Sequence, residues 1–257
     1  TVKRDGVLTL GTVTGRVKLQ MVLTEYQSRR LAIASKLVQS SLVYHRGSFY
    51  LMLGIEVPVE SRQEGNGTIG VDFGVVNIAT DSDGMTYAGD SVEQCRRWTQ
   101  SRRQALQRIG TRSARRRLQQ LSSYESNCRR TRNHQISSEL VAKAKGTCRD
   151  LAIENLAGIR NRIRFKGRSQ RAKMSSWAFK QLRDFIAYKA KLAGVRLVLV
   201  DPRNTSRTCP ICSHCEKSNR RSQSAFQCCS CGFAANADEV GAINISRLGA
   251  LGAPTVD

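Results

Sequence analysis

The sequence lacks any long hydrophobic run. Its longest apolar stretches, such as residues 195–200, have the length of a β-strand, whereas a membrane-spanning helix needs roughly 18 to 20 apolar residues. It also lacks a secretory signal peptide, and four of its nine cysteines have the spacing of metal ligands rather than of a secreted disulfide scaffold. We therefore predict a cytoplasmic, nucleoid-associated protein with no membrane partner. Because the chain begins at Thr1, we also expect that a front portion is absent.

Acidic and aromatic residues are both scarce. Lys and Arg number 42 against 20 Asp and Glu, which gives a formal net charge of +22. This excess is too large for an ordinary solvated surface, and it indicates a polyanionic partner, with nucleic acid favoured over a membrane surface. Since only 6% of the residues are aromatic, we expect phosphate neutralisation to contribute more to binding than base stacking does.

The positive charge is concentrated in two segments. Residues 96–132 hold twelve Arg against a single acid, Glu125, and residues 160–173 hold seven basic residues and no acid. Solvated helix faces usually mix both signs, so this imbalance favours contact with phosphates. The residues that we expect to bind nucleic acid are Arg96, Arg97, Arg102, Arg103, Arg108, Arg112, Arg115, Arg116, Arg117, Arg162, Arg164 and Lys166. Charge alone does not distinguish DNA from RNA.

Two CxxC pairs lie near the end of the chain. Cys209 and Cys212 form the first pair and Cys228 and Cys231 the second, with a short polar segment between them. A single CxxC is also found in redox motifs, but two pairs at this distance have the ligand spacing of a four-thiolate zinc ribbon. We predict a structural Zn²⁺, closed by four ligands and without catalytic chemistry. Five cysteines lie outside the set, namely Cys95, Cys128, Cys148, Cys215 and Cys229; exchange of a ligand with either of the last two stays open.

The order of predicted elements indicates the fold class. Residues 6–10, 16–23, 37–44 and 48–56 favour strands, and the polar segment 58–67 is the best domain boundary. Strands at 68–71, 77–80 and 85–88 follow, then a helical hairpin over 91–146. A strand at 150–153, a helix at 177–193, a strand at 195–200 and a last helix complete the chain. This is the element order of a ribonuclease-H-like α/β domain.

Three carboxylates stand where such a fold requires them. Asp72 ends one buried strand, Glu154 ends another, and Asp238 opens the last helix. Each has an ordinary explanation, as a turn former, a strand-end charge or a helix cap. Held together, they could bind the two Mg²⁺ ions that activate water and stabilise the leaving oxygen in phosphodiester hydrolysis. Glu239 is a second choice for the last ligand, although the register of residues 242–245 favours Asp238.

Several sequence runs resemble the OrfB/TnpB family of insertion-sequence transposon proteins. They are residues 69–74, 152–156, 204–212, 226–232 and 238–245, with the helix at 177–190 as a further match. The resemblance implies a RuvC-type nuclease domain over 68–203, a zinc ribbon over 204–235, a final helix and tail over 236–257, and a partial, β-barrel-like wedge domain over 1–60. It implies that Asp72, Glu154 and Asp238 are catalytic. One departure is Val240, where the family usually has Asn.

Two classes of function follow. The resemblance implies a transposon-encoded, Mg²⁺-dependent, RNA-guided DNA endonuclease, of the kind often labelled a transposase and related to compact type V CRISPR effectors, with DNA and a guide RNA as partners. The alternative is a catalytically silent nucleic-acid-binding accessory protein of a transposon. Retention of all three carboxylates favours the enzyme. A DNA-transposing recombinase is disfavoured, because no tyrosine nucleophile with a paired His motif is present. The sequence leaves the oligomeric state open.

Overall fold

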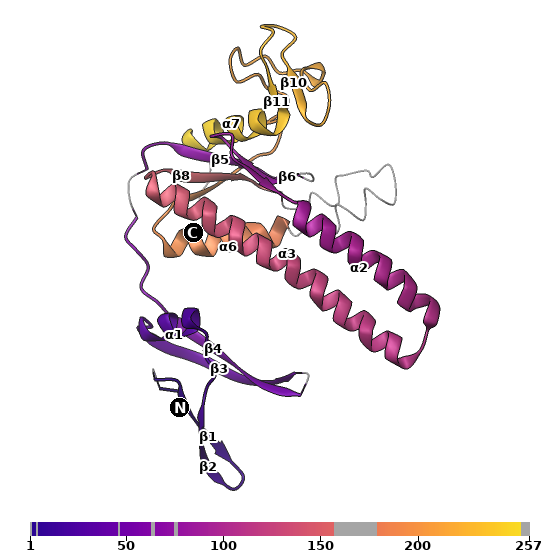
Figure 1. Ribbon diagram of the computed structural model, residues 1–257. Coiled ribbons are helices and arrows are strands. Elements are labelled where there is room, and N and C mark those ends of the chain that lie inside the picture. Colours follow the sequence, from indigo (N-terminus) through magenta and orange to yellow (C-terminus); the bar gives the residue numbers. More distant parts are fainter. Residues whose placement is uncertain are drawn as a thin grey trace. The chain divides into compact units, whose positions relative to one another are not determined.

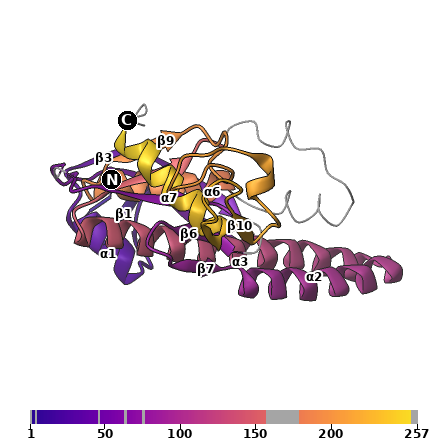
Figure 2. The same cartoon turned by 90° about the horizontal axis from the view of Figure 1, so that it is seen from above.

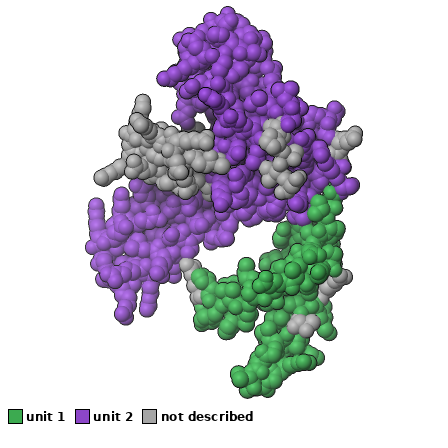
Figure 3. Space-filling view, turned by 180° about the vertical axis from the view of Figure 1, so that it is seen from behind, with its two compact units in different colours: residues 1–60 green, residues 61–257 purple. Residues whose placement is uncertain are grey.

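The chain forms two compact units. The computed structural model describes residues 2–3, 5–45, 47–62, 65–74, 77–156 and 179–252. The two units are Thr1–Glu60 and Ser61–Asp257, which Figure 3 shows in green and purple. The division falls inside the polar segment 58–67. Within the described ranges, no helix combines the length and the hydrophobicity needed to cross a bilayer.

The first unit consists of two β-hairpins and a short helix. The hairpins pair β1 (Val7–Thr12) with β2 (Gly15–Gln20), and β3 (Lys36–His45) with β4 (Ser48–Glu56). These four strands confirm the predicted ones. Each hairpin is a separate two-stranded sheet, so the described residues of this unit do not close a barrel.

The helix α1 (Glu25–Ala32) was not predicted. Its start carries a reciprocal cap: Gln27 N donates to Thr24 Oγ1 at 3.3 Å, and Thr24 N donates to Gln27 Oε1 at 2.8 Å. A Thr followed three residues later by Gln is a recognised helix-start signal. The sequence therefore contained the information, but the segment is too short and polar to show a clear apolar period.

The second unit is built on a five-stranded mixed sheet (Figure 1). Its spatial order is β7-β6-β5-β8-β9, with β5–β8 and β8–β9 parallel and the other two pairs antiparallel. The bounds are β5 (Thr68–Asp72), β6 (Asn77–Asp81), β7 (Thr86–Ala88), β8 (Asp150–Glu154) and β9 (Leu197–Val200). All five confirm predicted strands to within two residues at either end. The central strand is β5, so its carboxyl end lies in the middle of the sheet edge.

Helices cover both faces of this sheet. The helices are α2 (Asp90–Ile109), α3 (Arg112–Gly146), α6 (Phe179–Leu192) and α7 (Ala237–Ala250). Figures 1 and 2 show α7 on one face and α3 with α6 on the other. Side chains alternate accordingly, because Ile69 and Ile153 join the core under α3 and α6, whereas Ala152 and Val198 pack with Ile245 of α7. The predicted order of strands and helices is confirmed; Trp177 and Ala178, expected to open α6, lie outside the described residues.

The long hairpin of α2 and α3 turns at a glycine. Gly110 ends α2 with φ of 68°, and the Thr111 hydroxyl then accepts the Ala114 amide at 3.3 Å to begin α3. Only the second half of α3 belongs to the core, through Ile136 and Leu140. The hairpin end, which carries most of the arginines, extends beyond the sheet (Figure 1).

The helix α7 lies directly on the backbone of β5. A Cβ added at Gly70 would lie 2.1 Å from the Ala242 carbonyl oxygen and 2.3 Å from the Ser246 amide nitrogen. The Ser246 hydroxyl donates to the Thr68 carbonyl at 2.6 Å and fixes the helix along the strand. No side chain fits between the two backbones at this point.

We expect Gly70→Ala to destabilise the second unit by about 3 kcal/mol or more, at the upper end of overpacking costs, because both clashing atoms belong to the backbone of α7. Urea denaturation followed by circular dichroism measures the change. Gly146→Ala is the matched control, since a Cβ there meets nothing within 4 Å. Its effect should stay within about 1 kcal/mol. Equal stability of the two variants would contradict the close approach.

Candidate metal and nucleic-acid sites

The sheet brings two of the predicted carboxylates to one edge. In the parallel pair β5–β8, Val71 is opposite Ile153, so the next residues, Asp72 and Glu154, leave the sheet side by side. Parallel strands end at the same edge, which is where sheets of this kind place their ligands. Both residues occupy the positions that the sequence predicted.

The first turn of α7 brings the third carboxylate to the same edge. The Asn236 side chain caps the helix by accepting the Asp238 amide at 2.9 Å. A Cβ at Gly241 would lie 3.0 Å from Asp72 Oδ2, and a Cβ at Gly74 would lie 3.9 Å from Asp238 Oδ2. Asp72 therefore lies against the start of α7, and Asp238 lies above the loop that follows β5.

Glu239, the second choice for the last ligand, lies elsewhere. Its Oε1 would be 3.7 Å from a Cβ at Gly84, in the turn between β6 and β7. Asp238, and not Glu239, is among the charges that raise the pKa of Asp72.

The electrostatics of Asp72 agree with its position near the other two carboxylates. Burial raises the pKa of Asp72 well above its usual value, and the negative charges of Glu154 and Asp238 raise it further. These groups come from three separate segments of the chain. Negative charges gathered in this way favour a cation.

A residue that precedes the first CxxC pair holds the Glu154 side chain in one orientation. The Glu154 side chain is buried, and the Thr205 hydroxyl donates to its Oε1 at 2.7 Å. Burial raises the pKa of Glu154, while the hydrogen bond from Thr205 and the charge of Arg220 act in the opposite direction. In turn, Asn244 of α7 donates to the carbonyls of Thr205 and Thr208 at 2.7 and 2.8 Å.

Sequence reasoning missed Arg220. Its positive charge lowers the pKa of both Asp72 and Glu154. Its guanidinium also donates to the Gln223 carbonyl at 3.1 Å, which ties it to its own loop. The residue is one of many arginines in the sequence and lies far along the chain from Asp72, so no local signal identifies it.

The donor set of this edge fits hard divalent cations. Carboxylate oxygens are the ligands that Mg²⁺ prefers. Among the described residues, no three His, Cys, Asp or Glu side chains outside the four cysteines have ligand atoms that all lie within 4.8 Å of one another. The three carboxylates therefore do not form a compact single-ion group in this arrangement.

The four cysteines of the two CxxC pairs form a group able to hold a metal ion. The sulfurs of Cys209, Cys212, Cys228 and Cys231 all lie within 4.8 Å of one another. Cys209 Sγ is 3.6 Å from Cys231 Sγ, and Cys212 Sγ is 3.5 Å from Cys228 Sγ. Tetrahedral ligands about 2.3 Å from a zinc ion are separated by about 3.8 Å, so the arrangement fits.

Backbone amides donate to two of these four sulfurs and favour the thiolate form of Cys228. The Ile211 amide donates to Cys209 Sγ at 3.4 Å, and the Cys231 amide donates to Cys228 Sγ at 3.5 Å. The amide of Cys231, followed by that of Ser230, lowers the pKa of the Cys228 thiol to about 6. Thiolates are the ligand form of cysteine.

A buried asparagine joins the two CxxC pairs. Asn219 ends the short helix η1 (Lys217–Asn219), donates to the carbonyls of Arg207 and His214 at 2.9 and 3.0 Å, and accepts the Cys229 amide at 2.9 Å. The hairpin of β10 (Ala225–Gln227) and β11 (Ala234–Asn236) follows and leads into α7. Sequence reasoning did not single out this residue.

The surplus cysteines lie outside the metal-binding group. Cys215 and Cys229 are both exposed and are not among the four clustered sulfurs, and the Cys229 thiol donates to the Ser218 hydroxyl at 3.3 Å. Cys95 and Cys128 face each other between α2 and α3, where burial, followed by the contact with Cys128, raises the pKa of Cys95 to about 12.

Nine of the predicted nucleic-acid-binding arginines lie on the α2–α3 hairpin. Three of them have acidic partners: Arg96 and Arg97 pair with Glu93 at 2.7 and 3.0 Å, and Arg103 pairs with Glu125 at 2.9 Å. Six have no carboxylate partner among the described residues, namely Arg102, Arg108, Arg112, Arg115, Arg116 and Arg117. The predicted Arg162, Arg164 and Lys166 lie outside the described residues.

Comparison with known proteins places these features in a family. Residues 52–160 match the family model of a probable transposase, OrfB_IS605, and residues 179–245 match that of the Cas12f1-like TNB domain. The second match contains all four clustered cysteines and Asp238. The first contains Asp72, Glu154 and the arginine-rich hairpin.

Similar curated proteins carry related names. The CRISPR-associated endodeoxyribonuclease Cas12f1 of Syntrophomonas palmitatica is 30% identical over 207 residues, which are 74% of this chain and 40% of that protein. The putative RNA-guided DNA endonuclease InsQ of Escherichia coli is 29% identical over 79% of this chain and 54% of its own length. The TnpB-like protein MJ0751 of Methanocaldococcus jannaschii is 33% identical over 44% of this chain and 40% of its own length. The chain thus spans about half, or less, of the length of these relatives.

Solved structures share the fold. A Cas12f1–sgRNA–target DNA complex aligns with a TM-score of 0.57 and 19% identity over 80% of this chain and 55% of that chain. A CRISPR–Cas12f ternary complex aligns with a TM-score of 0.56 and 21% identity over 82% of this chain and 44% of that chain. The protein is therefore of the α/β class found in the Cas12f proteins. The two family models and the relatives identify the family within that class. The protein belongs to the OrfB/TnpB family of transposon proteins, which is related to the type V effectors.

We expect the cysteine group to bind one metal ion per chain. After exchange with Co²⁺, the protein should show the absorption band of thiolate-bound cobalt, and the double variant Cys209→Ser, Cys231→Ser should lose the band and the ion. The matched double variant Cys215→Ser, Cys229→Ser removes two exposed thiols and should keep both. Full metal content in the first variant would show that these sulfurs are not the ligands.

Proposed function

We propose that this chain is the nuclease part of a transposon-encoded, RNA-guided DNA endonuclease. The observation that carries the proposal is that Asp72 and Glu154 end neighbouring parallel strands while Asp238 opens the helix packed beside Asp72, so that the charges of Glu154 and Asp238 both raise the pKa of Asp72. The relatives named as endonucleases support the activity, and the similarity to a Cas12f1 complex with sgRNA and target DNA supports DNA and a guide RNA as partners. We assign the sheet of the second unit to a ribonuclease-H-like, RuvC-type domain, because the strand order and the position of the carboxylates agree with one.

We assign to Asp72, Glu154 and Asp238 the binding of Mg²⁺. When bound, Mg²⁺ supplies activation of the attacking water and stabilisation of the leaving oxygen of the phosphodiester. The chain's own residues prepare the edge. Thr205 holds the Glu154 carboxylate through its hydroxyl at 2.7 Å, and Gly241 leaves room for the Asp72 carboxylate beside α7. Arg220 offsets part of the repulsion among the carboxylates.

We assign the four clustered cysteines to a structural zinc ion. Four thiolates close the coordination shell, so the ion has no open position for substrate. Cys209 and Cys228 pack in one buried cluster with Phe226 and with Val240 of α7. The ion would therefore stabilise the segment that delivers both Asp238 and Arg220 to the carboxylate edge.

We assign the arginines of the α2–α3 hairpin that lack carboxylate partners to phosphate binding. Arg115, Arg116 and Arg117 follow one another in the first turns of α3 and are exposed. Consecutive residues on a helix point in different directions, so together they present charge over a broad part of its surface. The wedge assignment of residues 1–60 belongs to the same proposal.

Asp72→Ala should lower Mg²⁺-dependent DNA cleavage by more than about 100-fold, beyond the 10–100-fold that loss of a residue orienting a metal ligand typically costs. Thr205→Val, which removes the hydrogen bond to Glu154, should lower the cleavage rate by about 10- to 100-fold. The assay uses the whole protein encoded by the native gene with the RNA that co-purifies with it, and it follows cleavage of labelled DNA.

Binding of nucleic acid should survive in both variants, because it depends on the arginine surface. Asp184→Ala, an aspartate whose side chain is 50% exposed on α6, is the control and should cut normally. Normal cutting by Asp72→Ala would refute the site, and a wild type that binds but never cuts would favour the silent accessory protein.

Neutralising Arg115, Arg116 and Arg117 with Gln should make DNA affinity less dependent on salt. Each lost phosphate contact reduces the slope of log K against log salt by about 0.9 for duplex DNA, so the triple variant should lose up to about 2.7. Fluorescence anisotropy at four salt concentrations gives the slope. The control replaces Arg96, Arg97 and Arg103, which already have carboxylate partners, and should change the slope less. An identical change in both triple variants would refute the distinction.

A further inference from the structure

Large apolar side chains are exposed along the end of the α2–α3 hairpin. Trp98 is 47% exposed, Tyr124 is 52% exposed and Ile109 is 60% exposed. Antiparallel helices ordinarily bury such residues against each other, as Ile136 and Leu140 are buried nearer the sheet. Exposed apolar residues that gather in one place mark an interaction site.

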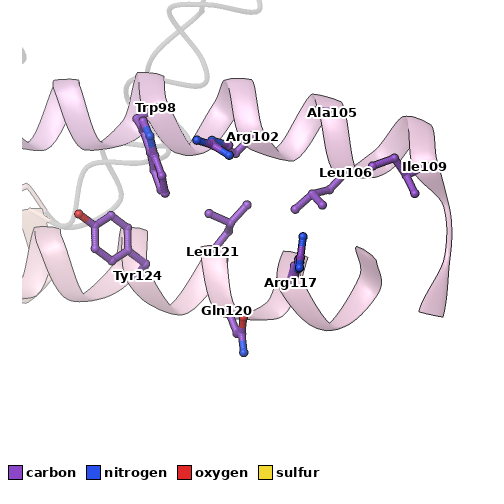
Figure 4. Close-up of a pocket in the computed structure, with 9 residues that line it drawn as sticks. All are labelled: Trp98, Arg102, Ala105, Leu106, Ile109, Arg117, Gln120, Leu121 and Tyr124. Carbon is purple, nitrogen blue, oxygen red and sulfur yellow. The ribbon is translucent and has the colours of Figure 1, made fainter. Parts of the chain in front are cut away.

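These side chains line a groove of about 510 Å³ between the two helices, a volume inside the roughly 300–1,000 Å³ typical of ligand pockets. Figure 4 shows Trp98 and Leu106 projecting from α2, and Leu121 and Tyr124 projecting from α3, into the same space. The rings of Trp98 and Tyr124 meet edge to face, with centroids 5.5 Å apart at 62°. Both residues are about half exposed despite this contact.

Arginines stand at the border of the groove. The Arg102 guanidinium lies 5.4 Å from the centre of the Trp98 ring, and Arg117 projects from α3 into the groove (Figure 4). Neither has a carboxylate partner among the described residues. Aromatic faces beside unpaired guanidinium groups have the composition of sites that stack a base and bind its phosphates.

The charge of the hairpin argues against a second copy of this chain in the groove. Residues 96–132 contain twelve Arg and one acid, Glu125, which is already paired with Arg103. Two copies would bring these like charges together, whereas a nucleic acid would neutralise them.

We propose that this groove binds an unpaired base of a single-stranded RNA, with the base stacked on Trp98 or Tyr124 and the flanking phosphates on Arg102 and Arg117. Proteins recognise RNA mainly through unpaired bases, which stack on aromatic rings and on arginine planes. The guanidinium of Arg117 also carries N–H groups that can donate to a 2′-hydroxyl, the group that distinguishes RNA from DNA.

The position of the groove favours RNA over the DNA that is cut. An α-helix rises 1.5 Å per residue, so Trp98 lies roughly 12 Å along α2 from Asp90, and Ile109 lies roughly 28 Å from it. The groove runs along the part of α2 between Trp98 and Ile109. Figures 1 and 2 show this end of the hairpin extending away from the sheet. A strand held there is remote from the carboxylate edge, as a guide would be and a strand undergoing cleavage would not. This choice of RNA rests on the proposed function; the presence of a base site does not.

The test compares binding of fluorescein-labelled twelve-nucleotide rU and dU strands by the full chain in EDTA, so that no cleavage occurs. We expect tighter binding of the rU strand, and we expect Trp98→Ala to weaken it roughly 5- to 100-fold without changing its salt dependence, because stacking involves no counterion release. Trp98→Phe should retain most of the affinity. Arg102→Gln with Arg117→Gln should instead reduce the salt slope by up to about 1.4 for a single strand.

A spectroscopic measurement reports on the groove directly. The chain contains two tryptophans, so Trp177→Phe leaves Trp98 as the sole one. In that variant the rU strand should quench the fluorescence of Trp98, whereas a preformed rA–rU duplex and inorganic polyphosphate should not. Tyr188→Ala, an exposed tyrosine on α6 outside the groove, should leave binding unchanged, and circular dichroism verifies that each variant is folded.

Three results would overturn the proposal. One is binding of the rU strand that does not quench the fluorescence of Trp98, or whose affinity is unchanged in Trp98→Ala. Another is dU binding as tight as rU binding, which would make DNA the occupant. The third is a concentration-dependent dimer abolished by Trp98→Ala, which would make a second copy the occupant. Because no cleavage is measured, failure of the endonuclease assay would leave these results standing, and failure here would leave the carboxylate site untouched.

Discussion

The contact of α7 with the bare backbone of β5 at Gly70 is the constraint on which the second unit depends. Because a Cβ at this residue would lie 2.1 Å from the Ala242 carbonyl oxygen, the helix can lie no closer, and any side chain would push it away. This approach sets where Asp238 stands above the edge that carries Asp72. The same helix carries Asn244, which holds the segment around Thr205. One backbone contact therefore positions groups from the sheet, the last helix and the cysteine-rich segment.

The carboxylate edge is a small negative region in a chain with a formal net charge of +22. Burial and mutual repulsion both raise the pKa of Asp72, so ionising all three carboxylates together carries a cost that cations would relieve. Arg220 supplies part of this relief from within the chain. A large positive net charge favours phosphates at long range, whereas gathered carboxylates favour cations locally, and the two sets of side chains lie at different places on the same unit.

The sequence predicted those features that depend on local patterns. Alternating or continuous apolar runs identified the strands, and the end of each strand identified Asp72 and Glu154. Ligand spacing identified the cysteines, since two tight turns must face each other to share an ion. Arg220 and Asn219 could not be identified in this way, because their roles arise only when distant segments meet. The aromatic groove was missed for a related reason: its rings come from two helices and are few in a chain whose composition pointed to phosphate contacts.

Asn219 and Arg220 are neighbours in sequence but serve different parts of the protein. The first ties together the loops that carry the four sulfurs, through hydrogen bonds of 2.9 to 3.0 Å, and the second directs its charge to Asp72 and Glu154. A single peptide bond thus links the scaffold around the thiols to the electrostatics of the carboxylates. The position of the Arg220 charge beside the carboxylates therefore depends on the same short segment that Asn219 holds against the two CxxC pairs.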